Sequence, residues 1–237
     1  MDNSGYVTLA RQSGLMREMQ AIAHNIANVS TTGYRREGVL FSEHVRGLGT
    51  DEASLSMAAA NARQTWLAQG GLSFTGGSLD LAIEGEGFFV IETDQGERLT
   101  RAGHFAIDAA GEIVNPDGFR LLDDGGAPIL VPPGAQIAVS RDGTISADGE
   151  PVAQLGLLRP ADPSQLSRQG GTLLATEGEL LPAGESVIHQ GFLEDSNVNP
   201  MTEMARMIDV HRAYEAGQKF LDREDERIRA VIQTLSR

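Results

Sequence analysis

The chain has 237 residues, of which 41% are hydrophobic and 22% charged, so it is long enough for one full hydrophobic core with additional elements. Its formal net charge of −14 argues against nucleic acid as a partner, because phosphate binding needs a basic surface. Cysteine is absent, which excludes a disulfide framework, thiolate catalysis and cysteine-based zinc sites.

The charge is distributed unevenly along the chain. Residues 1–37 carry four basic and three acidic side chains, residues 201–237 carry seven of each, and the residues between them carry 8 basic against 23 acidic ones. An acidic body keeps subunits soluble, whereas near-neutral ends can pack side by side without repelling one another. This division is typical of a protein that assembles.

The first segment, from about Ser4 to Asn28, has the periodicity of an amphipathic helix. Ser4 can serve as its N-cap, and Gly33 is a plausible stop signal. Residues 1–20 lack a basic region followed by an apolar run, so we expect no cleavable signal peptide. We also expect no membrane span, because no stretch reaches the roughly 18 apolar residues that one requires. The apolar stripe of this helix consists of Leu9, Leu15, Met16, Met19, Ile22, Ala23 and Ile26.

Residues 34–75 mix short apolar runs with small and polar residues, and we interpret them as an extended connector. In residues 76–198 short apolar runs, some with strand-like alternation, are separated by Asp-Gly turn signals at 117–118, 124–125, 142–143 and 148–149. This pattern predicts an antiparallel β domain, either barrel-like or sandwich-like. The predicted strands are Leu79–Ile83, Phe88–Ile91, His104–Ile107, Ile113–Val114, Ile129–Val131, Ile137–Val139 and Leu155–Leu158.

The last segment predicts a second, longer helix. Asn199 can cap it, and Pro200 suits the first helical position, where the missing N–H would be unpaired anyway. At about 1.5 Å per residue it would reach roughly 55 Å, too long to bury its stripe against a small β domain, so it needs the first helix or other copies of the chain. Three members of the stripe are polar: His211, Gln218 and Asp225. They either set the register of the helix–helix contact within a thin hydrated layer or face solvent. The whole stripe is Met204, Met207, His211, Tyr214, Gln218, Leu221, Asp225, Ile228, Ile232 and Leu235.

Candidate chemical sites are weak. His24 and His211 have no ligand partner at a known metal-binding spacing, and the Asp-Gly pairs do not follow the EF-hand pattern. The run 85–87 lacks the third glycine of a dinucleotide-binding loop. The acidic residues at 80, 84 and 86 could be considered as a glycosidase carboxylate pair, but their alternation is typical of the solvent-exposed face of a strand. We therefore expect no catalytic residue, no cofactor, no metal and no enzymatic activity.

Three separated motifs, in the right order, resemble the flagellar rod and hook protein family. Residues 23–35, Ala-His-Asn-Ile-Ala-Asn-Val-Ser-Thr-Thr-Gly-Tyr-Arg, resemble the signature that closes the first helix of that family. Residues 79–90, with 100–105 and 108–111, resemble the start of its β domain, and residues 196–200, 203–204 and 212–215 resemble its C-terminal signature. The motif residues carried over are Asn25, Asn28, Gly33, Tyr34, Asn197, Asn199 and Pro200.

Together the patterns predict an α+β fold. Long N- and C-terminal helices, residues 1–33 and 199–237, are expected to pack together in a coiled-coil-like manner as an assembly domain. Residues 34–75 are expected to connect this domain to a central antiparallel all-β domain, residues 76–198.

The resemblance implies a structural subunit of the flagellar basal-body rod. Members of this family are exported without a cleaved signal peptide, through the flagellar type III export apparatus, and assemble in the periplasm with other copies of themselves and other rod subunits. The length and the short opening are most similar to the proximal-rod members, with a distal-rod subunit as the alternative. A rod-associated module that binds or hydrolyses cell wall is the alternative from a different class.

We expect the two terminal segments to be poorly ordered in the free subunit and to fold as they dock, because a helix with an unpartnered apolar stripe is marginal in water. Docking would lock the subunit against torsion. The expected assembly interface is Leu9, Leu15, Met16, Met19, Ile22, Ala23, Ile26, Met204, Met207, His211, Tyr214, Leu221, Ile228, Ile232 and Leu235.

Overall fold

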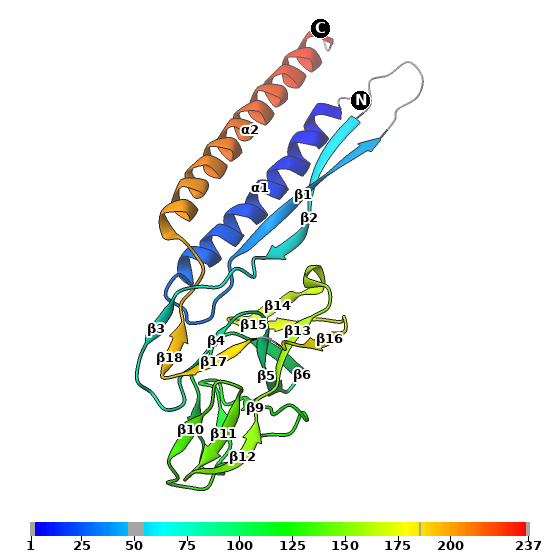
Figure 1. Cartoon of the computed structure of the whole chain (residues 1–237). Helices are drawn as coiled ribbons and strands as arrows, with labels where there is room; N and C mark the ends of the chain where they lie inside the picture. The colour runs from blue at the N-terminus through cyan, green and yellow to red at the C-terminus, as the bar shows by residue number, and fades with distance from the viewer. Residues whose placement is uncertain (1–2, 47–54, 185, 236–237) are drawn as a thin grey trace. The chain divides into compact units, whose positions relative to one another are not determined.

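The computed structural model of the chain describes residues 3–46, 55–184 and 186–235, and these form two compact units (Figure 1). The helical unit contains the described residues of 1–27, 37–64 and 199–237. The β unit contains the described residues of 28–36 and 65–198. The residues predicted as a connector are therefore divided between the two units, with 37–64 grouped with the helices.

In the helical unit, α1 (Asn3–Ala27) and α2 (Pro200–Leu235) run antiparallel, since residues near the end of α1 contact residues near the start of α2. The amide N–H of Thr202 donates to Oδ1 of Asn199 at 3.1 Å, so Asn199 caps α2 and Pro200 is its first residue, as predicted. The unit also holds β1 (Glu37–Arg46) and β2 (Leu55–Thr65), which pair with each other in a two-stranded sheet.

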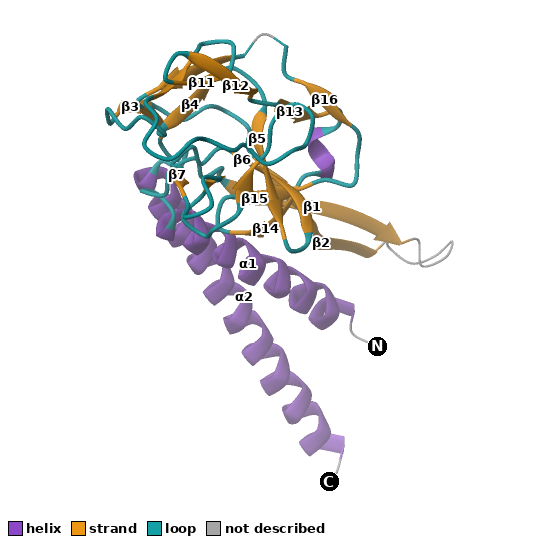
Figure 2. Ribbon diagram, turned by 90° about the horizontal axis from the view of Figure 1, so that it is seen from below, coloured by secondary structure: helices purple, strands orange, loops and turns teal. Residues whose placement is uncertain are grey.

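The prediction of a coiled-coil-like helix pair is wrong, although the α+β class is consistent with the structure. Among the described side chains, the cluster between the helices has just three buried hydrophobic residues, Leu15, Ile22 and Val210. All α2 side chains from 225 to 234 are exposed, and Figure 2 shows the helices separating toward the N- and C-termini. A straight helix drifts about 20° per heptad, so without supercoiling a repeat of seven does not stay on one contact line.

The β unit consists of short antiparallel strands. The largest sheet follows the order β14–β15–β6–β5–β9–β8–β7, with β13 and β16 joined to it through β5. Smaller sheets are β10–β11–β12, β17–β4 and β18–β3. The bounds are β3 Leu72–Phe74, β4 Leu81–Glu84, β5 Phe88–Thr93, β6 Gly96–Thr100, β7 Ala106–Ile107, β8 Ile113–Val114, β9 Arg120–Leu121, β10 Ile137–Val139, β11 Thr144–Ala147, β12 Glu150–Gln154, β13 Leu157–Pro160, β14 Ser167–Gly170, β15 Leu173–Ala175, β16 Leu180–Pro182, β17 Val187–Gln190 and β18 Phe192–Glu194, with a 3₁₀ turn at Pro163–Gln165.

Three successive turns of the β unit are built in the same way. Oδ1 of Asp108, Asn115 and Asp123 accepts the backbone N–H groups two and four residues further along, at 2.8–3.1 Å. In each turn the third residue after the capping side chain is a glycine with positive φ, at 111, 118 and 126. The pair at 124–125 was expected to supply a turn, and the positive φ lies one residue later, at Gly126.

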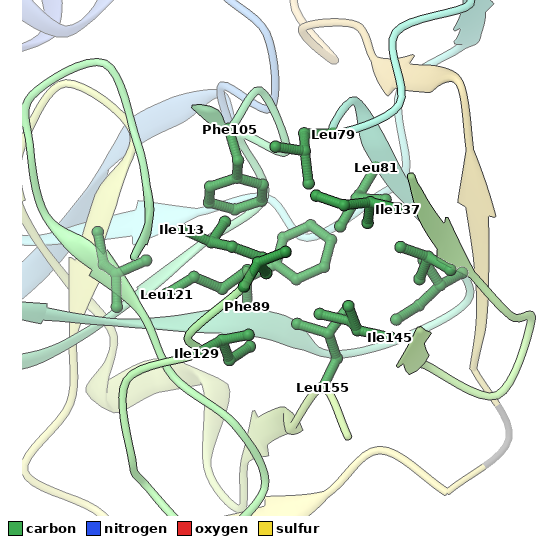
Figure 3. Close-up of a cluster of buried hydrophobic side chains, with 14 of the residues drawn as sticks. Leu79, Leu81, Phe89, Phe105, Ile113, Leu121, Ile129, Ile137, Ile145 and Leu155 are labelled. Carbon is green, nitrogen blue, oxygen red and sulfur yellow. The ribbon is translucent and has the colours of Figure 1, made fainter. Parts of the chain in front are cut away.

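The core of the β unit is a cluster of buried aliphatic and aromatic side chains from many strands and loops (Figure 3). Phe89 and Phe105 contact each other edge to face, with ring centroids 5.5 Å apart. Ile129 and Val131 are buried in this core, but the predicted strand there is reduced to an isolated bridge at Leu130. The labelled members in Figure 3 are Leu79, Leu81, Phe89, Phe105, Ile113, Leu121, Ile129, Ile137, Ile145 and Leu155.

Candidate assembly interface

The interior of the helix pair contains a small apolar cluster. Leu15 and Ile22 of α1 pack with Val210 of α2, and half-buried side chains surround them. At about 25 cal/mol per Å², each such side chain contributes roughly 1.5–3 kcal/mol before ordering costs. The half-buried members are Met19, Ile26, Met207, Ala213 and Tyr214.

A polar contact and a groove lie next to this cluster. Nε2 of the buried Gln12 donates to the carbonyl oxygen of Tyr214 at 2.9 Å. Gly217 leaves the space for this side chain, since a Cβ there would lie 2.5 Å from Nε2. Beside it is a groove of about 360 Å³ between α1 and α2. Its lining includes Val7, Arg11, Ala213, Ala216 and Phe220.

Asn25 connects three elements of the helical unit. Its side chain is fully buried, its Nδ2 donates to the carbonyl oxygen of Glu37 at 2.7 Å, and its Oδ1 accepts the N–H of Glu37 at 2.9 Å. Nδ2 also donates to Oε2 of Glu203 at 2.9 Å. Arg206 lies 3.5 Å from Glu203 and donates to Glu18 at 3.0 Å, which adds a second link between the helices. Asn25 and Glu203 both lie in motifs noted in the sequence, but their contact was not predicted.

The structure divides the predicted assembly residues into two groups. One group lies in the contact between the helices and consists of Leu15, Met19, Ile22, Ile26, Met207 and Tyr214, with Leu221 half-buried. The other group is exposed and consists of Leu9, Met16, Ala23, Met204, His211, Ile228 and Ile232. Leu235 closes α2, and its side chain lies outside what the structure describes. Their role in assembly stays a prediction.

The side of α2 that faces α1 is displaced by one residue from several predicted positions. Glu203, Val210 and Gly217 are at least half buried there, whereas Met204, His211 and Gln218 are exposed. Asp225 is exposed as well, so all three polar members of the predicted stripe face solvent, which was one of the two alternatives. Other apolar side chains that the pattern did not select are also exposed: Met201, Ile208, Phe220 and Val231.

The motif residues of the β unit hold neighbouring chain segments together. Tyr34 is buried, and the guanidinium of Arg168 lies over its ring, 4.3 Å from the centroid. Oδ1 of Asn197 accepts the N–H of Arg36 at 2.6 Å. Nδ2 of Asn197 donates to the carbonyl oxygens of Trp66 at 2.9 Å and Ala68 at 2.8 Å. Asn28 accepts the hydroxyl of Thr31 at 3.1 Å, in the turn after α1.

A buried ion cluster in the β unit was not predicted from the sequence. Glu194 is fully buried and contacts Arg35 at 2.5 Å and Arg101 at 3.1 Å, while the N–H of Gly70 donates to it at 2.8 Å. Burial lowers the pKa of Arg101 to about 10, although the Glu194 carboxylate opposes this shift. These residues are far apart in the sequence and share no local spacing, so no pattern could have indicated the cluster.

The acidic residues considered as a catalytic set have separate partners. Asp80 lies 2.6 Å from Nδ1 of His104, Glu84 lies 2.6 Å from Nε2 of His189, and the exposed Glu86 is 3.9 Å from Arg159. Among the described residues no group of three or more histidine, aspartate or glutamate side chains could hold a metal ion. Within that same part of the chain, no helix has the length and apolar character of a membrane span.

Comparison with known proteins identifies the family. The model of the flagellar hook protein FlgE/F/G D1 domain matches residues 82–147, and that of the flagellar basal body rod FlgEFG protein C-terminal matches residues 189–234. The flagellar basal-body rod protein FlgF of Caulobacter vibrioides is 37% identical over 245 residues, covering 100% of this chain and 99% of the relative. The chain belongs to the flagellar basal-body rod protein family.

Other members of the rod family are similar along nearly their full length. FlgF of Rhizobium meliloti is 35% identical, covering 99% of this chain and 98% of the relative. FlgG of Bacillus subtilis is 28% identical, with 98% of each chain covered. The C-terminal family model includes Glu194, Asn197 and Glu203, and the D1 model includes Arg101, so both matches span residues of the contacts described above.

Proposed function

We propose that this chain is a structural subunit of the flagellar basal-body rod that polymerises through α1 and α2. The observation that carries the proposal is the set of apolar side chains that α2 exposes. Ile228, Val231 and Ile232 are 44%, 46% and 59% exposed. Their spacings of three and four residues place them on one face of α2, and a contiguous exposed apolar patch marks an interaction surface. The relatives named as rod proteins support the same role.

The partners in this proposal are other copies of the chain and other rod subunits. Each exposed apolar side chain would be covered by a neighbour on assembly, and the contacts along several turns would resist rotation between subunits, as transmission of torque requires. The near-neutral ends of the chain permit this packing, whereas the acidic β unit would keep the outside soluble. Export through the flagellar export apparatus and location in the basal body belong to the same proposal, as does the absence of catalysis.

We assign the chain to the proximal part of the rod. This assignment is supported by three FlgF relatives that match at 35–37% identity, whereas the FlgG relatives match at 28–32% and two further FlgF relatives at 31–32%. The full-length match to FlgG makes a distal-rod subunit the second candidate. The proximal and distal assignments differ in the point at which rod assembly would stop when the chain is missing.

Electron microscopy of basal bodies from a strain that lacks this chain tests the proposal. We expect structures that end as a short stub, without distal rod or hook. A longer incomplete rod would favour the distal position instead, and complete basal bodies with normal motility would contradict a rod role.

Complementation of that strain then tests the helix surface. A chain with Ile228→Asp and Ile232→Asp should fail to restore the rod, because each change places a charge in the proposed contact. Val152→Asp is the matched control, since Val152 is also exposed but lies in β12 of the β unit. Equal restoration by both variants would show that this part of α2 does not mediate assembly.

A further inference from the structure

The first residue of β1 is held by a side chain instead of by a neighbouring strand. Asn25 of α1 both donates to the carbonyl oxygen of Glu37 and accepts its N–H, at 2.7 and 2.9 Å, as an adjacent antiparallel strand would. The sheet that follows has only two strands, β1 and β2, and a two-stranded ribbon is marginally stable by itself in water. The order of this hairpin therefore depends on its attachment to α1, to which the hydrogen bonds of Asn25 contribute.

The position of Asn25 depends in turn on α2. Its Nδ2 group has two hydrogens, one donated to Glu37 and the other to Oε2 of Glu203. The Glu203 side chain is 1% exposed and lies in the first turn of α2. When α2 is not docked, the amide loses this charged acceptor and water can reach it, so its hydrogen bonds to Glu37 compete with water and hold β1 less firmly.

We propose that Asn25 is a positioning residue that couples the order of the β1–β2 hairpin to the docking of α2 through Glu203. The hairpin then belongs to the same folding step as the two helices and becomes ordered together with them. This inference rests on the proposed function and on the expectation that the terminal segments fold as they dock. The β1–β2 hairpin is grouped with α1 and α2 in one compact unit, and not with the β unit, which is consistent with a shared folding step.

Amide hydrogen exchange of the full chain, resolved by residue, tests the coupling. We expect Glu203→Ala to accelerate exchange of the β1 amides about tenfold or more, as Asn25→Ala does, because the Glu203 carboxylate accepts the second hydrogen of the amide that holds Glu37. Glu203→Gln should restore slow exchange, because its amide oxygen can still accept from Asn25. The double variant Asn25→Ala with Glu203→Ala should exchange no faster than the more affected single variant.

Gln12→Ala is the matched control. Gln12 also links α1 to α2, but through the carbonyl oxygen of Tyr214, about three turns beyond Glu203 in α2. Its loss should therefore accelerate exchange only in the part of α2 near residue 214, while the part of α2 around Glu203 and the β1 amides change less than twofold. If Glu203→Ala leaves the β1 amides unchanged while Asn25→Ala accelerates them, Asn25 holds β1 to α1 alone and the coupling is overturned.

The wild-type chain gives an independent outcome. Protection of β1 and of the part of α2 around Glu203 should rise or fall together, whether in the free subunit or in the assembled form. A protected β1 beside an unprotected start of α2 would contradict the proposal. Failure here is distinguishable from failure of the rod function, because a stub in the deletion strain would still establish the rod role while the exchange pattern alone decides the coupling.

Discussion

Gly33 lies in a position of the β unit that no side chain can occupy. Its φ of 67° is in the left-handed region, and a Cβ there would lie 2.3 Å from the backbone of Arg101 and Ala102. Its N–H donates to the carbonyl oxygen of Glu194 at 2.7 Å, so the backbone cannot move away without losing this bond. The glycine expected to end the first helix thus has a packing role that its sequence position does not reveal.

Gly33→Ala should lower the free energy of unfolding by about 3 kcal/mol or more, because backbone strain and a backbone clash act together. Gly118→Ala is the control: its φ is 83°, but the space around a Cβ is open, so strain alone should cost about 1 kcal/mol. Urea denaturation of both variants measures the difference. Equal losses would mean that the close approach at Gly33 is relieved by a small shift.

Asp80 makes the stability of the β unit depend on pH. Burial by itself would raise the pKa of Asp80, but the Thr75 hydroxyl at 2.5 Å and the His104 ring hold it below its ordinary value. A carboxyl with a lowered folded-state pKa stabilises the fold above its unfolded pKa, about 3.9, and this stabilisation is lost as the pH falls through the lower folded value.

The difference in unfolding free energy between the wild type and Asp80→Asn should therefore be complete above about pH 5 and shrink below about pH 4. Thr75→Val removes one of the two stabilising hydrogen bonds and so raises the folded-state pKa of Asp80. The decline should then be smaller and end at a higher pH. Unfolding curves between pH 2 and 7 give the measurement. A difference independent of pH would assign the effect of Asp80→Asn to shape and not to charge.

At the scale of elements, α2 has two parts with different partners. Its first part contacts α1 through Val210, Ala213 and Gly217, where small side chains allow close approach. Its last part, from residue 225 to 234, exposes every side chain in the described structure. The apolar stripe continues through both, so the periodicity of the sequence alone does not indicate where one contact ends.

Val210→Ala should therefore destabilise the helical unit by about 1–2 kcal/mol, because it removes buried methyl groups from a small cluster. Ile228→Ala in the free subunit should change stability by less than about 0.5 kcal/mol, since its side chain is 44% exposed. Thermal unfolding of the two variants, monitored by the helical circular dichroism signal, measures both losses of stability. A comparable loss at residue 228 would indicate that the subunit is already associated in solution.

At the scale of the whole molecule, the proposal that the terminal segments fold on docking predicts a free chain with less helix than the structure contains. α1 has 25 residues and α2 has 36, and the apolar cluster between them is small. Helices that lack an apolar partner along much of their length are marginal in water.

Circular dichroism of the purified chain at high dilution should therefore report fewer helical residues than these two helices contain, with the signal rising as the chain assembles. A helical signal that is complete at the lowest concentration and unchanged on assembly would contradict the folding step. The same measurement on the Val210→Ala variant provides a reference for a weakened helix pair.

The sequence by itself determined the features that depend on local chemistry. The 3.6-residue period placed the first helix at about Ser4 to Asn28, against Asn3–Ala27 in the structure, and Asn199-Pro200 marked the start of α2. Alternation and Asp-Gly turns indicated an antiparallel β region, and the motifs indicated the family. Strands such as β14, Ser167–Gly170, were not predicted, because short segments that contain glycine and serine show no alternation of apolar and polar residues.

The tertiary structure alone decided which residues meet. Arg35, Arg101 and Glu194 form one cluster although 159 residues separate the first from the last, and Asn25 contacts Glu203 across 178 residues. It also decided that the helices pack over a short contact and not as a coiled coil. A local pattern reports which face of an element is apolar, whereas the pairing of faces and of buried charges depends on the path of the whole chain in space.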